Sequence, residues 1–538
     1  MPQEDQAAAR AEQLNTRAAG IISLAVMCSR ILGLAREQIF AALFGGGRAM
    51  DAFTAAFRIP NLLRDLFAEG ALSTAFVTTF SRRIARQGDA AAWRLADKVG
   101  TLATVFLSAV VLLGVVGAPW LVTLIAPGFD ADKAQLTVLL ARVMFPFILL
   151  VSLAALVMGL LNAKNVFGMP AMASSFFNLG SIAAGVVLGY WLDPHFGPRA
   201  VLGLAVGTLI GGALQLAVQL PSLTRVGYAF RPDFGWRDEG IRDILRLMGP
   251  SVIAASTTQV NVMVNSMFAS TLGDGPIFWL SIAFRLMQLP LGLFGVALGT
   301  VTLPLLARVA AVGDLHTFRS ELARGMRLAF ILTIPATVGL MLLAEPIISV
   351  LYQHGRFTAA DAAQAAGALR YYAIGLAGYA ALKVLVNAFY ALDRRRTPML
   401  VSFLAVAVNL GLNWLFTFRL GWGHRGLAFS TGCVATINFL ILYVLMRRHL
   451  GALQTRMMAS TLARVLLATL LLGLVCWAGA HWLLADWAGM RFLPKLGALL
   501  ATIVVAGGAF FAAVLALRVR DLDGLAAALQ RRLRRGRA

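Results

Sequence analysis

Five arginine side chains of this chain lie within hydrophobic segments, where a charge is costly. They are Arg30, Arg36, Arg58, Arg64 and Arg285. An arginine at the centre of a membrane-spanning helix costs about 2.5–3.5 kcal/mol, so it is kept where it meets a counter-ion, water or an anionic ligand. A guanidinium holds two phosphate oxygens at once and does not lose its proton. The set therefore predicts a binding site for a phosphate-bearing molecule.

Carboxylates and one amide accompany these arginines in the first two segments. The supporting residues are Glu37, Asp51, Asn61, Asp65 and Glu69. Pairing with them can neutralise some arginines and merely lock the two helices together, and this alternative stays open for any single arginine. Arg58 and Asp65 share one helix face, which makes Asp65 a candidate partner for Arg58. Because the arginines outnumber the embedded carboxylates Glu37, Asp65 and Glu69, positive charge remains for an anionic substrate.

The composition identifies the elements that must position these residues. Of 538 residues, 59% are hydrophobic and only 13% are charged, whereas soluble domains carry about 25% charged residues. We therefore expect an all-α polytopic membrane protein with about fourteen spans of about 20 residues or more. The predicted spans are 18–45, 50–81, 99–125, 135–162, 170–192, 199–222, 247–272, 277–307, 328–351, 362–392, 397–418, 424–446, 465–485 and 496–517.

The distribution of basic residues predicts the orientation. Most of the 47 Lys and Arg residues lie in predicted loops on the side of the N-terminus. Positive charge marks the cytoplasmic side, so both termini are expected in the cytoplasm. The net charge of +22 then reflects topology and attraction to anionic phospholipids, and we expect no nucleic-acid partner. The arginines near the C-terminus fit a juxtamembrane anchor to such lipids.

A short repeat suggests two parallel halves. Ala71-Leu72-Ser73-Thr74 followed by Arg82 recurs at the same separation as Ala297-Leu298-Gly299-Thr300 followed by Arg308. Six spans separate the copies, so the halves run in the same direction, an architecture in which transporters bind substrate between halves. The predicted organisation is a tail (1–17), an N-lobe of six helices (18–222), a cytoplasmic linker (223–246), a C-lobe of six helices (247–446), two extra helices (465–517) and a basic tail (518–538).

Uncharged amides in two other spans are candidates for a site that binds a coupling cation. They are Gln259, Asn261, Asn265, Asn409 and Asn413. Bonding between neighbouring helices is the competing and favoured interpretation. The histidines and cysteines lack metal-ligand spacing, so we expect no metal site, no cofactor and no catalytic residue. A nucleotide-binding GxxxxGK[ST] motif is also missing, so energy would come from a sodium or proton gradient, the membrane potential or the substrate gradient.

Two stretches of sequence resemble a known family. The first comprises residues 29–37 (SRILGLARE), 51–53 (DAF), 60–64 (PNLLR) and 67–71 (FAEGA). The second comprises Arg285-Leu286, residues 289–292 (LPLG), 295–300 (GVALGT) and Leu303-Pro304. Together they are similar to the signature of the MurJ (MviN) lipid II flippases of the MOP exporter superfamily, and the similarity covers essentially the whole chain.

The resemblance implies a function and a location. Members of the family move lipid II, the undecaprenyl-pyrophosphate-linked peptidoglycan precursor, from the cytoplasmic to the periplasmic leaflet of the bacterial inner membrane. They work by alternating access, with two six-helix lobes rocking around a cationic cavity. The implied partners are lipid II, anionic phospholipids and proteins of cell-wall synthesis, and the expected state is a monomer.

The resemblance also implies roles for single residues. The family's functional arginines map onto Arg30, Arg36, Arg64 and Arg285, which would hold the pyrophosphate and control lobe closure, and its aspartate maps onto Asp51. The last two helices resemble a groove for the polyprenyl tail. Some members have a sodium site between the seventh and eleventh helices, with an acidic residue where this chain has amides. Phe284 stands where some members have an acidic residue, which favours a role for Arg285 in binding substrate.

Three alternatives remain. A polysaccharide-lipid exporter on the same architecture would bind the same pyrophosphate, and only the signature of the first two helices argues against it. A non-transporting membrane scaffold of cell-wall synthesis is a second alternative. An integral lipid-phosphate enzyme is a third, but it would need an acid–base pair or metal cluster within the membrane, and the sequence offers none.

Overall fold

The described part of the chain is helical throughout and divides into two compact units. This computed structural model describes residues 2–65, 72–484, 490–519 and 521. Unit 1 comprises Met1–Ile277 together with His354–Phe357, and unit 2 comprises Phe278–Gln353 and Thr358–Ala538. The predicted all-α fold is thus confirmed. The lobe boundaries predicted from the sequence differ from this division, because α9 packs with unit 1 here, and they stay a prediction.

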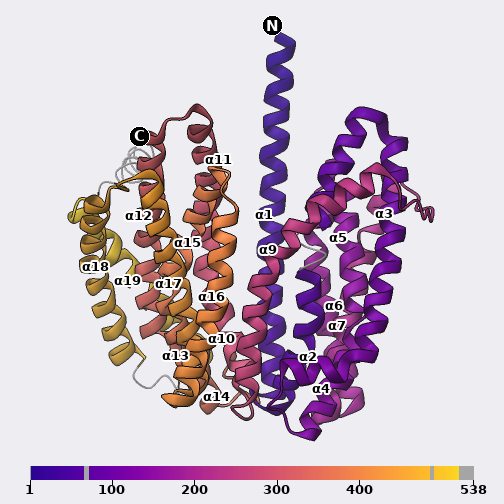
Figure 1. Cartoon of the computed structure of the whole chain (residues 1–538). Helices are drawn as coiled ribbons and strands as arrows, with labels where there is room; N and C mark the ends of the chain where they lie inside the picture. Colours follow the sequence, from indigo (N-terminus) through magenta and orange to yellow (C-terminus); the bar gives the residue numbers. More distant parts are fainter. Residues whose placement is uncertain (1, 66–71, 485–489, 520, 522–538) are drawn as a thin grey trace. The chain divides into compact units, whose positions relative to one another are not determined.

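The helices of unit 1 span the first half of the chain (Figure 1). They are α1 (Pro2–Phe44), α2 (Arg48–Arg64), α3 (Ser73–Ile125), α4 (Ala131–Met144), α5 (Phe147–Ala163), α6 (Gly168–Leu192), α7 (Val201–Ala217), α8 (Leu220–Arg225) and α9 (Glu239–Ser270). Helices α6 and α7 approach so closely that a Cβ atom added to Gly207 would lie 2.5 Å from the backbone nitrogen of Gly185. Glycine is therefore required where these helices cross, as in other membrane helix pairs.

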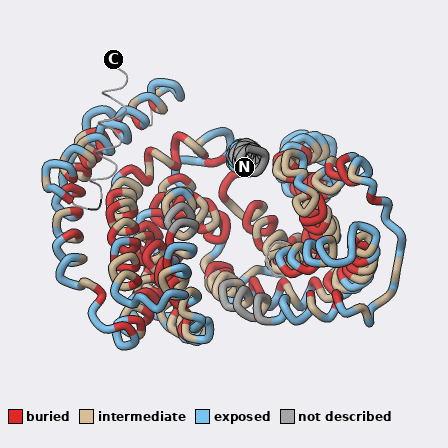
Figure 2. Tube along the Cα trace, turned by 90° about the horizontal axis from the view of Figure 1, so that it is seen from above, coloured by how far each residue is buried: buried red, intermediate tan, exposed pale blue. Residues whose placement is uncertain are grey.

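The described part of unit 2 is also built from helices. They are α10 (Pro276–Pro290), α11 (Val296–Val312), α12 (Leu315–Leu342), α13 (Ala344–Tyr352), α14 (Ala359–Ile374), α15 (Leu376–Ala391), α16 (Arg396–Trp414), α17 (Gly423–Leu450), α18 (Thr455–Ala478) and α19 (Phe492–Ala516). Within each unit the buried positions gather on the helix faces that meet other helices (Figure 2). The opposite faces expose many large apolar side chains, as expected for lipid contact.

The chain is a multi-pass membrane protein. Ten described helices are long and apolar enough to cross a membrane, or up to eleven if α14 and α15 form one bent span. The bend between them is 42°. It falls at Gly375, where a Cβ atom would lie 2.4 Å from the Cα atom of Gly432. The predicted total of fourteen spans stays a prediction.

Helix breaks occur both between and within the predicted spans. Helix α3 is two helices joined at Gly88, whose φ of 77° and ψ of 177° are non-helical, and Gly88 lies between the predicted spans 50–81 and 99–125. Part of the span 50–81 lies outside the described residues. The span 277–307 contains a π-helical turn at Leu291–Gly295, directly after Pro290. Proline lacks a backbone donor and its ring clashes with the carbonyl four residues earlier, so it disturbs the regular helix.

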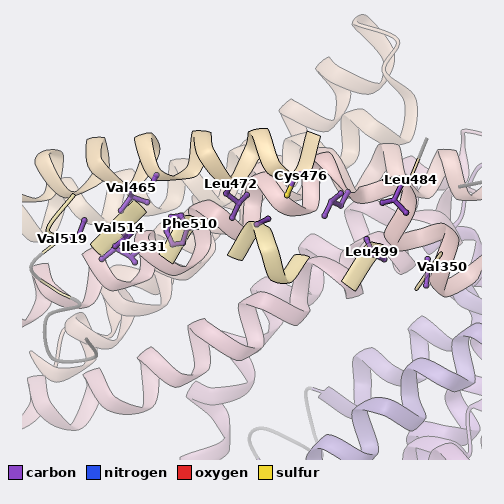
Figure 3. Packing of buried hydrophobic residues seen from close by; sticks show 13 residues of the cluster. Ile331, Val350, Val465, Leu472, Cys476, Leu484, Leu499, Phe510, Val514 and Val519 are labelled. Atoms are coloured by element: carbon purple, nitrogen blue, oxygen red, sulfur yellow. The ribbon is translucent and has the colours of Figure 1, made fainter. Parts of the chain in front are cut away.

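The last two helices pack on unit 2 through a continuous apolar core (Figure 3). Val465, Leu472 and Cys476 of α18 meet Leu499, Phe510 and Val514 of α19, and Ile331 of α12 joins the same cluster. Close packing of these side chains stabilises the pair through dispersion contacts, since helices within a membrane have no hydrophobic driving force toward each other. Whether these helices also form a groove for a lipid tail stays a prediction.

Candidate functional site

Arg30 and Arg36, the predicted site arginines of α1, lie beside α6. Arg30 is exposed and Arg36 is half-buried. The Arg36 guanidinium lies 4.9 Å from the centre of the Phe177 ring in α6. The neighbouring Asn178 donates from Nδ2 to the carbonyl of Ser29, over 3.2 Å. A ring face attracts a cation, so consecutive residues of α6 fix both the α1 backbone next to Arg30 and the position of Arg36.

An aromatic path supports Phe177 from behind. The ring of Phe147 in α5 lies 5.4 Å from that of Phe177 and 5.4 Å from that of Phe57 in α2. Phe147 is fully buried and Phe177 is 8% exposed. Such rings lose little freedom when packed and interact through their edges and faces. The path therefore connects α2, α5 and α6 behind the arginines of α1.

The end of α2 is bonded to α9. Arg64 donates to Asp65, with its Nη2 atom 2.9 Å from Oδ1. Gln259 of α9 donates to the other oxygen of Asp65 over 3.1 Å. Arg58 donates to the hydroxyl of Ser266, also in α9. Asp65 thus accepts from Arg64 and Gln259, and the expected pairing of Arg58 with Asp65 is replaced by a bond from Arg58 to α9.

Three other predicted residues add less. Glu37 and Asn61 are half-buried, in α1 and α2 respectively. Glu69 lies outside the described residues. All predicted site residues of the first two spans that the structure describes thus belong to unit 1.

A buried ionic cluster surrounds Asp51. This side chain is fully buried in the first turn of α2. It accepts from Lys133 Nζ of α4 over 3.0 Å and from the Gly275 backbone N–H over 2.7 Å. Lys133 is only 1% exposed and also binds Asp274 Oδ1 at 2.7 Å. Charges this deep are retained when each has a counter-charge and further hydrogen bonds. The cluster therefore joins α2, α4 and the turn before α10.

An exposed ion pair covers this cluster. Arg48 donates from two nitrogen atoms to Asp130, and its Nη1 atom lies 2.7 Å from Oδ2. Asp130 also caps α4 by accepting from the Lys133 backbone N–H. The hydrogen bond from Arg48 lowers the pKa of Asp130 to about 2. The pair is solvated, so it serves to position the α4 terminus beside Lys133 rather than to stabilise the fold.

Sequence reasoning found Asp51 but missed its partners. Lys133 lies just before a predicted span, so the sequence did not distinguish it from the other basic residues of the predicted loops. The local signal was Asp130, a capping residue three positions earlier. Asp274 gave no signal, because it follows 141 residues after Lys133 in sequence.

Arg285 belongs to unit 2. It is half-buried in α10, next to the fully buried Met287. Two contacts hold α10 against α14: Trp279 Nε1 donates to Asp361 over 3.0 Å, and the ring of Phe284 lies 5.4 Å from that of Tyr372. Phe284, which precedes Arg285, thus packs against the ring of Tyr372. This contact fixes the α10 backbone next to Arg285.

The amides proposed for an ion site make hydrogen bonds to protein. In unit 2, Asn413 Nδ2 donates to Asn409 Oδ1 over 2.9 Å, and Ser430 of α17 donates to Asn413 Oδ1. Both amide oxygens therefore already accept a hydrogen bond. In unit 1, Gln259 binds Asp65, Asn265 is half-buried, and the buried Asn261 Oδ1 has no partner among the described residues.

Metal-ligand clusters are missing from the described part of the chain, where no group of three His, Cys, Asp or Glu residues could hold an ion. The arrangement thus offers cations, amides and aromatic faces within helices. It suits binding of an anion more than bond-breaking chemistry.

Comparison with known proteins identifies the family. The family model "Lipid II flippase MurJ" matches residues 40–497. The lipid II flippase MurJ of Burkholderia cenocepacia is 35% identical over 505 residues, which cover 92% of this chain and 96% of that protein. The probable lipid II flippase MurJ of Haemophilus influenzae is 34% identical over 511 residues, covering 92% of this chain and 98% of that protein.

Solved structures agree on the fold. A lipid II flippase MurJ in an inward closed conformation has a TM-score of 0.72 at 24% identity, covering 92% of this chain and 99% of that one. An inward-facing multidrug resistance MATE transporter of the MOP superfamily has a TM-score of 0.66 at 16% identity, covering 81% and 99%. The length and identity of the sequence matches leave one conclusion: this chain belongs to the MurJ family.

Proposed function

We propose that this chain is a lipid II flippase that moves the undecaprenyl-pyrophosphate-linked peptidoglycan precursor from the cytoplasmic to the periplasmic leaflet. The observation that carries the proposal is family membership over most of the chain, together with arginines retained inside its helices. A flippase must shelter a diphosphate within the membrane, and fixed guanidinium groups replace the water that the diphosphate loses.

Arg30, Arg36, Arg64 and Arg285 are the proposed pyrophosphate ligands. Each lies in or at the end of a helix, and none is deeply buried. Contact with the Phe177 ring face stabilises Arg36 as a cation. Asp65 already neutralises part of the charge of Arg64, so Arg64 has to exchange this partner to bind substrate.

The supporting residues have a proposed role in conformational change. Arg58 and Asp65 bond α2 and its C-terminal end to α9, and these are the contacts proposed to open and close. Asp51 would support them by holding α2 to the turn after α9 through a buried bond from the Gly275 N–H. Glu37, Asn61 and Glu69 complete the proposed set. Alternating access requires contacts that form in one state and open in the other, and polar bonds of this type can exchange for water at a modest cost.

The cellular setting is also proposed. Both termini would be cytoplasmic in the bacterial inner membrane, because basic residues concentrate in the loops on that side. The protein would be a monomer. Its partners would be lipid II, anionic phospholipids and proteins of cell-wall synthesis. A sodium ion, a proton or the membrane potential would drive the cycle. The internal hydrogen bonds of Asn409 and Asn413 favour a structural role for these amides over sodium binding.

The decisive experiment combines depletion of this protein with a leaflet-specific assay of lipid II accessibility. Arg30→Ala and Arg285→Ala should leave lipid II in the cytoplasmic leaflet and fail to support growth. Arg395→Ala is the matched control, because this arginine is 77% exposed in a predicted cytoplasmic loop. Normal export of lipid II in the depleted cells would refute the flippase function, and normal export in both arginine variants would refute the clamp. Export of a polysaccharide-lipid instead would favour that alternative.

A further inference from the structure

Residues 227–237, called the strap, connect α8 to α9 in unit 1 and are tied to α3. The Tyr228 hydroxyl donates to Asp97 Oδ1 over 2.8 Å, and the Arg231 N–H donates to the same atom over 3.0 Å. The Asp233 N–H donates to the hydroxyl of Thr101 over 3.0 Å. In Figure 1 the strap is the pink segment that precedes α9, beside α3. It is therefore a fixed surface element rather than a loose linker.

The end of the strap is fixed as firmly as its start. Asp238, the N-cap of α9, accepts from Arg83 over 2.7 Å and from Lys98 over 2.8 Å. Burial alone would raise the pKa of Asp238, but these hydrogen bonds hold it below its usual range. Asp238 also accepts from the Gly240 N–H. The strap thus ends in a charged clasp between α3 and α9.

The strap exposes aromatic side chains that a soluble surface would bury. Phe230 is 51% exposed, Phe234 is 63% exposed and Trp236 is 62% exposed. Their depth follows from their attachment, because Asp97 and Thr101 flank residue 99, where the predicted third span begins. Tryptophan and other aromatic residues concentrate at this level of membrane proteins, between headgroups and acyl chains.

Basic side chains surround these rings. Arg225, Arg231 and Arg237 are exposed. The Arg237 guanidinium lies 4.7 Å from the Trp236 ring. Arg225 and Arg231 form no ion pair with any residue that the structure describes. Exposed arginines at the predicted cytoplasmic face attract anionic headgroups.

A cavity of about 230 Å³ opens beneath the strap. Its wall combines Phe230 and Tyr228 of the strap with Val99 of α3, Leu156 of α5 and Leu220 of α8. Leu220 is 44% exposed at its edge, whereas Val99 and Leu156 are buried. The lining is almost entirely apolar, which suits an acyl chain.

We propose that the strap and this cavity form a binding site for an anionic glycerophospholipid, with an acyl chain in the cavity and the phosphate at Arg225 and Arg231. The three exposed aromatic side chains lie at the glycerol level, between these two parts. The ligand is a lipid of the surrounding leaflet and not the transported substrate. The site is independent of the pyrophosphate arginines, so its test can fail while the proposed flippase function stands.

The test measures binding of phosphatidylglycerol to the purified full-length protein in neutral detergent, by native mass spectrometry and by thermal stabilisation. Phosphatidylcholine and soluble glycerol phosphate are the comparison ligands. We expect phosphatidylglycerol to bind more tightly than phosphatidylcholine, and glycerol phosphate, which lacks an acyl chain, to bind weakly. The Arg225→Gln/Arg231→Gln variant should bind phosphatidylglycerol about 10- to 30-fold more weakly, at about 1 kcal/mol per arginine.

A matched variant separates this site from general charge attraction. Arg394→Gln/Arg395→Gln removes the same charge from an exposed predicted cytoplasmic loop of unit 2, and it should bind phosphatidylglycerol normally. Leu220→Trp, which fills the cavity mouth, should weaken phosphatidylglycerol binding and leave the affinity for glycerol phosphate unchanged. Equal losses in the two arginine pairs, or equal affinity for the two phospholipids, would overturn the proposal. The proposal would also be overturned if the strap bound a cytoplasmic protein and the Arg225→Gln/Arg231→Gln variant bound phosphatidylglycerol as tightly as the native protein.

Discussion

The cluster around Asp51 and the arginines of α1 handle buried charge in opposite ways. Asp51 and Lys133 are almost completely buried, and each has an opposite charge within 3.0 Å. Arg30 is exposed, and Arg36 is half-buried against the ring of Phe177, at 4.9 Å. Both regions belong to unit 1, and both carry charges that a membrane protein retains only for a reason.

The difference separates charges that hold the protein together from charges kept for a ligand. A fully desolvated ion pair cannot exchange partners cheaply, because a lone buried charge costs several kcal/mol. A guanidinium on an aromatic face is held there by a weaker interaction, which costs less to give up when an anion arrives. Four variants test this distinction, in order of decreasing effect.

Lys133→Met should have the largest effect. It leaves Asp51 as a buried carboxylate without its cation, which should cost about 3–5 kcal/mol of stability. Thermal melting in detergent should show the loss, and growth should fail with it. The double variant Asp51→Asn/Lys133→Met should recover part of the stability, since Asp274 is half-exposed and can be hydrated. Equal stability of Lys133→Met and the native protein would show that the buried pair of Asp51 and Lys133 does not stabilise the fold.

Arg36→Ala should abolish transport while it barely changes stability. Lost hydrogen bonds to an anion are worth about 1.5–3 kcal/mol, whereas the lost contact with Phe177 should cost about 0.5–1 kcal/mol of folding. Complementation of growth and thermal melting measure the two effects separately. Arg36→Lys should restore only part of the transport, because an ammonium lacks the planar fork. A melting loss as large as that of Lys133→Met would make Arg36 structural.

Phe177→Leu should weaken lipid II binding about 2- to 30-fold, the equivalent of about 0.5–2 kcal/mol of cation–π attraction. Phe177→Tyr should restore binding. Phe147→Leu is the control, because this ring packs in the same cluster, 5.4 Å from Phe177, whereas the Arg36 guanidinium lies over the Phe177 ring. In a double-mutant cycle the effect of Phe177→Leu should vanish when Arg36 is already Ala. Additive losses would show that Phe177 acts only through packing.

Asn413→Ala should have the smallest effect on transport. It removes the hydrogen bonds to Asn409 and Ser430, each worth about 0.5–1.5 kcal/mol of stability. Thermal melting should show this loss, and the dependence of lipid II export on sodium should not change. If Asn413→Ala abolished a sodium dependence seen in the native protein, the amides of α16 would have a role in ion binding rather than a structural one.

The sequence predicted the elements better than it predicted their contacts. Long apolar segments identify membrane helices, because the hydrocarbon core demands them. The break at Gly88 falls in the loop predicted between the second and third spans. The bend at Gly375 was missed, since glycine is common in such helices and hydropathy does not record backbone angles. Arginines were identifiable as candidates because their cost stands out locally. The partners of Asp51 were not, because they lie 82 residues away at Lys133 and 224 residues away at Gly275.

The burial of Lys133 has a consequence for biosynthesis. Lys133 leaves the ribosome well before Asp274, which follows 141 residues later. At about 5–20 residues per second this interval is about 7–28 s. Of the two carboxylates that bind Lys133, only Asp51 has been synthesised by then. Insertion of α2 and α4 therefore precedes completion of the cluster by Asp274. Nascent chains arrested before Asp274 should therefore react at Lys133 with an amine reagent, and chains arrested after α10 should resist it.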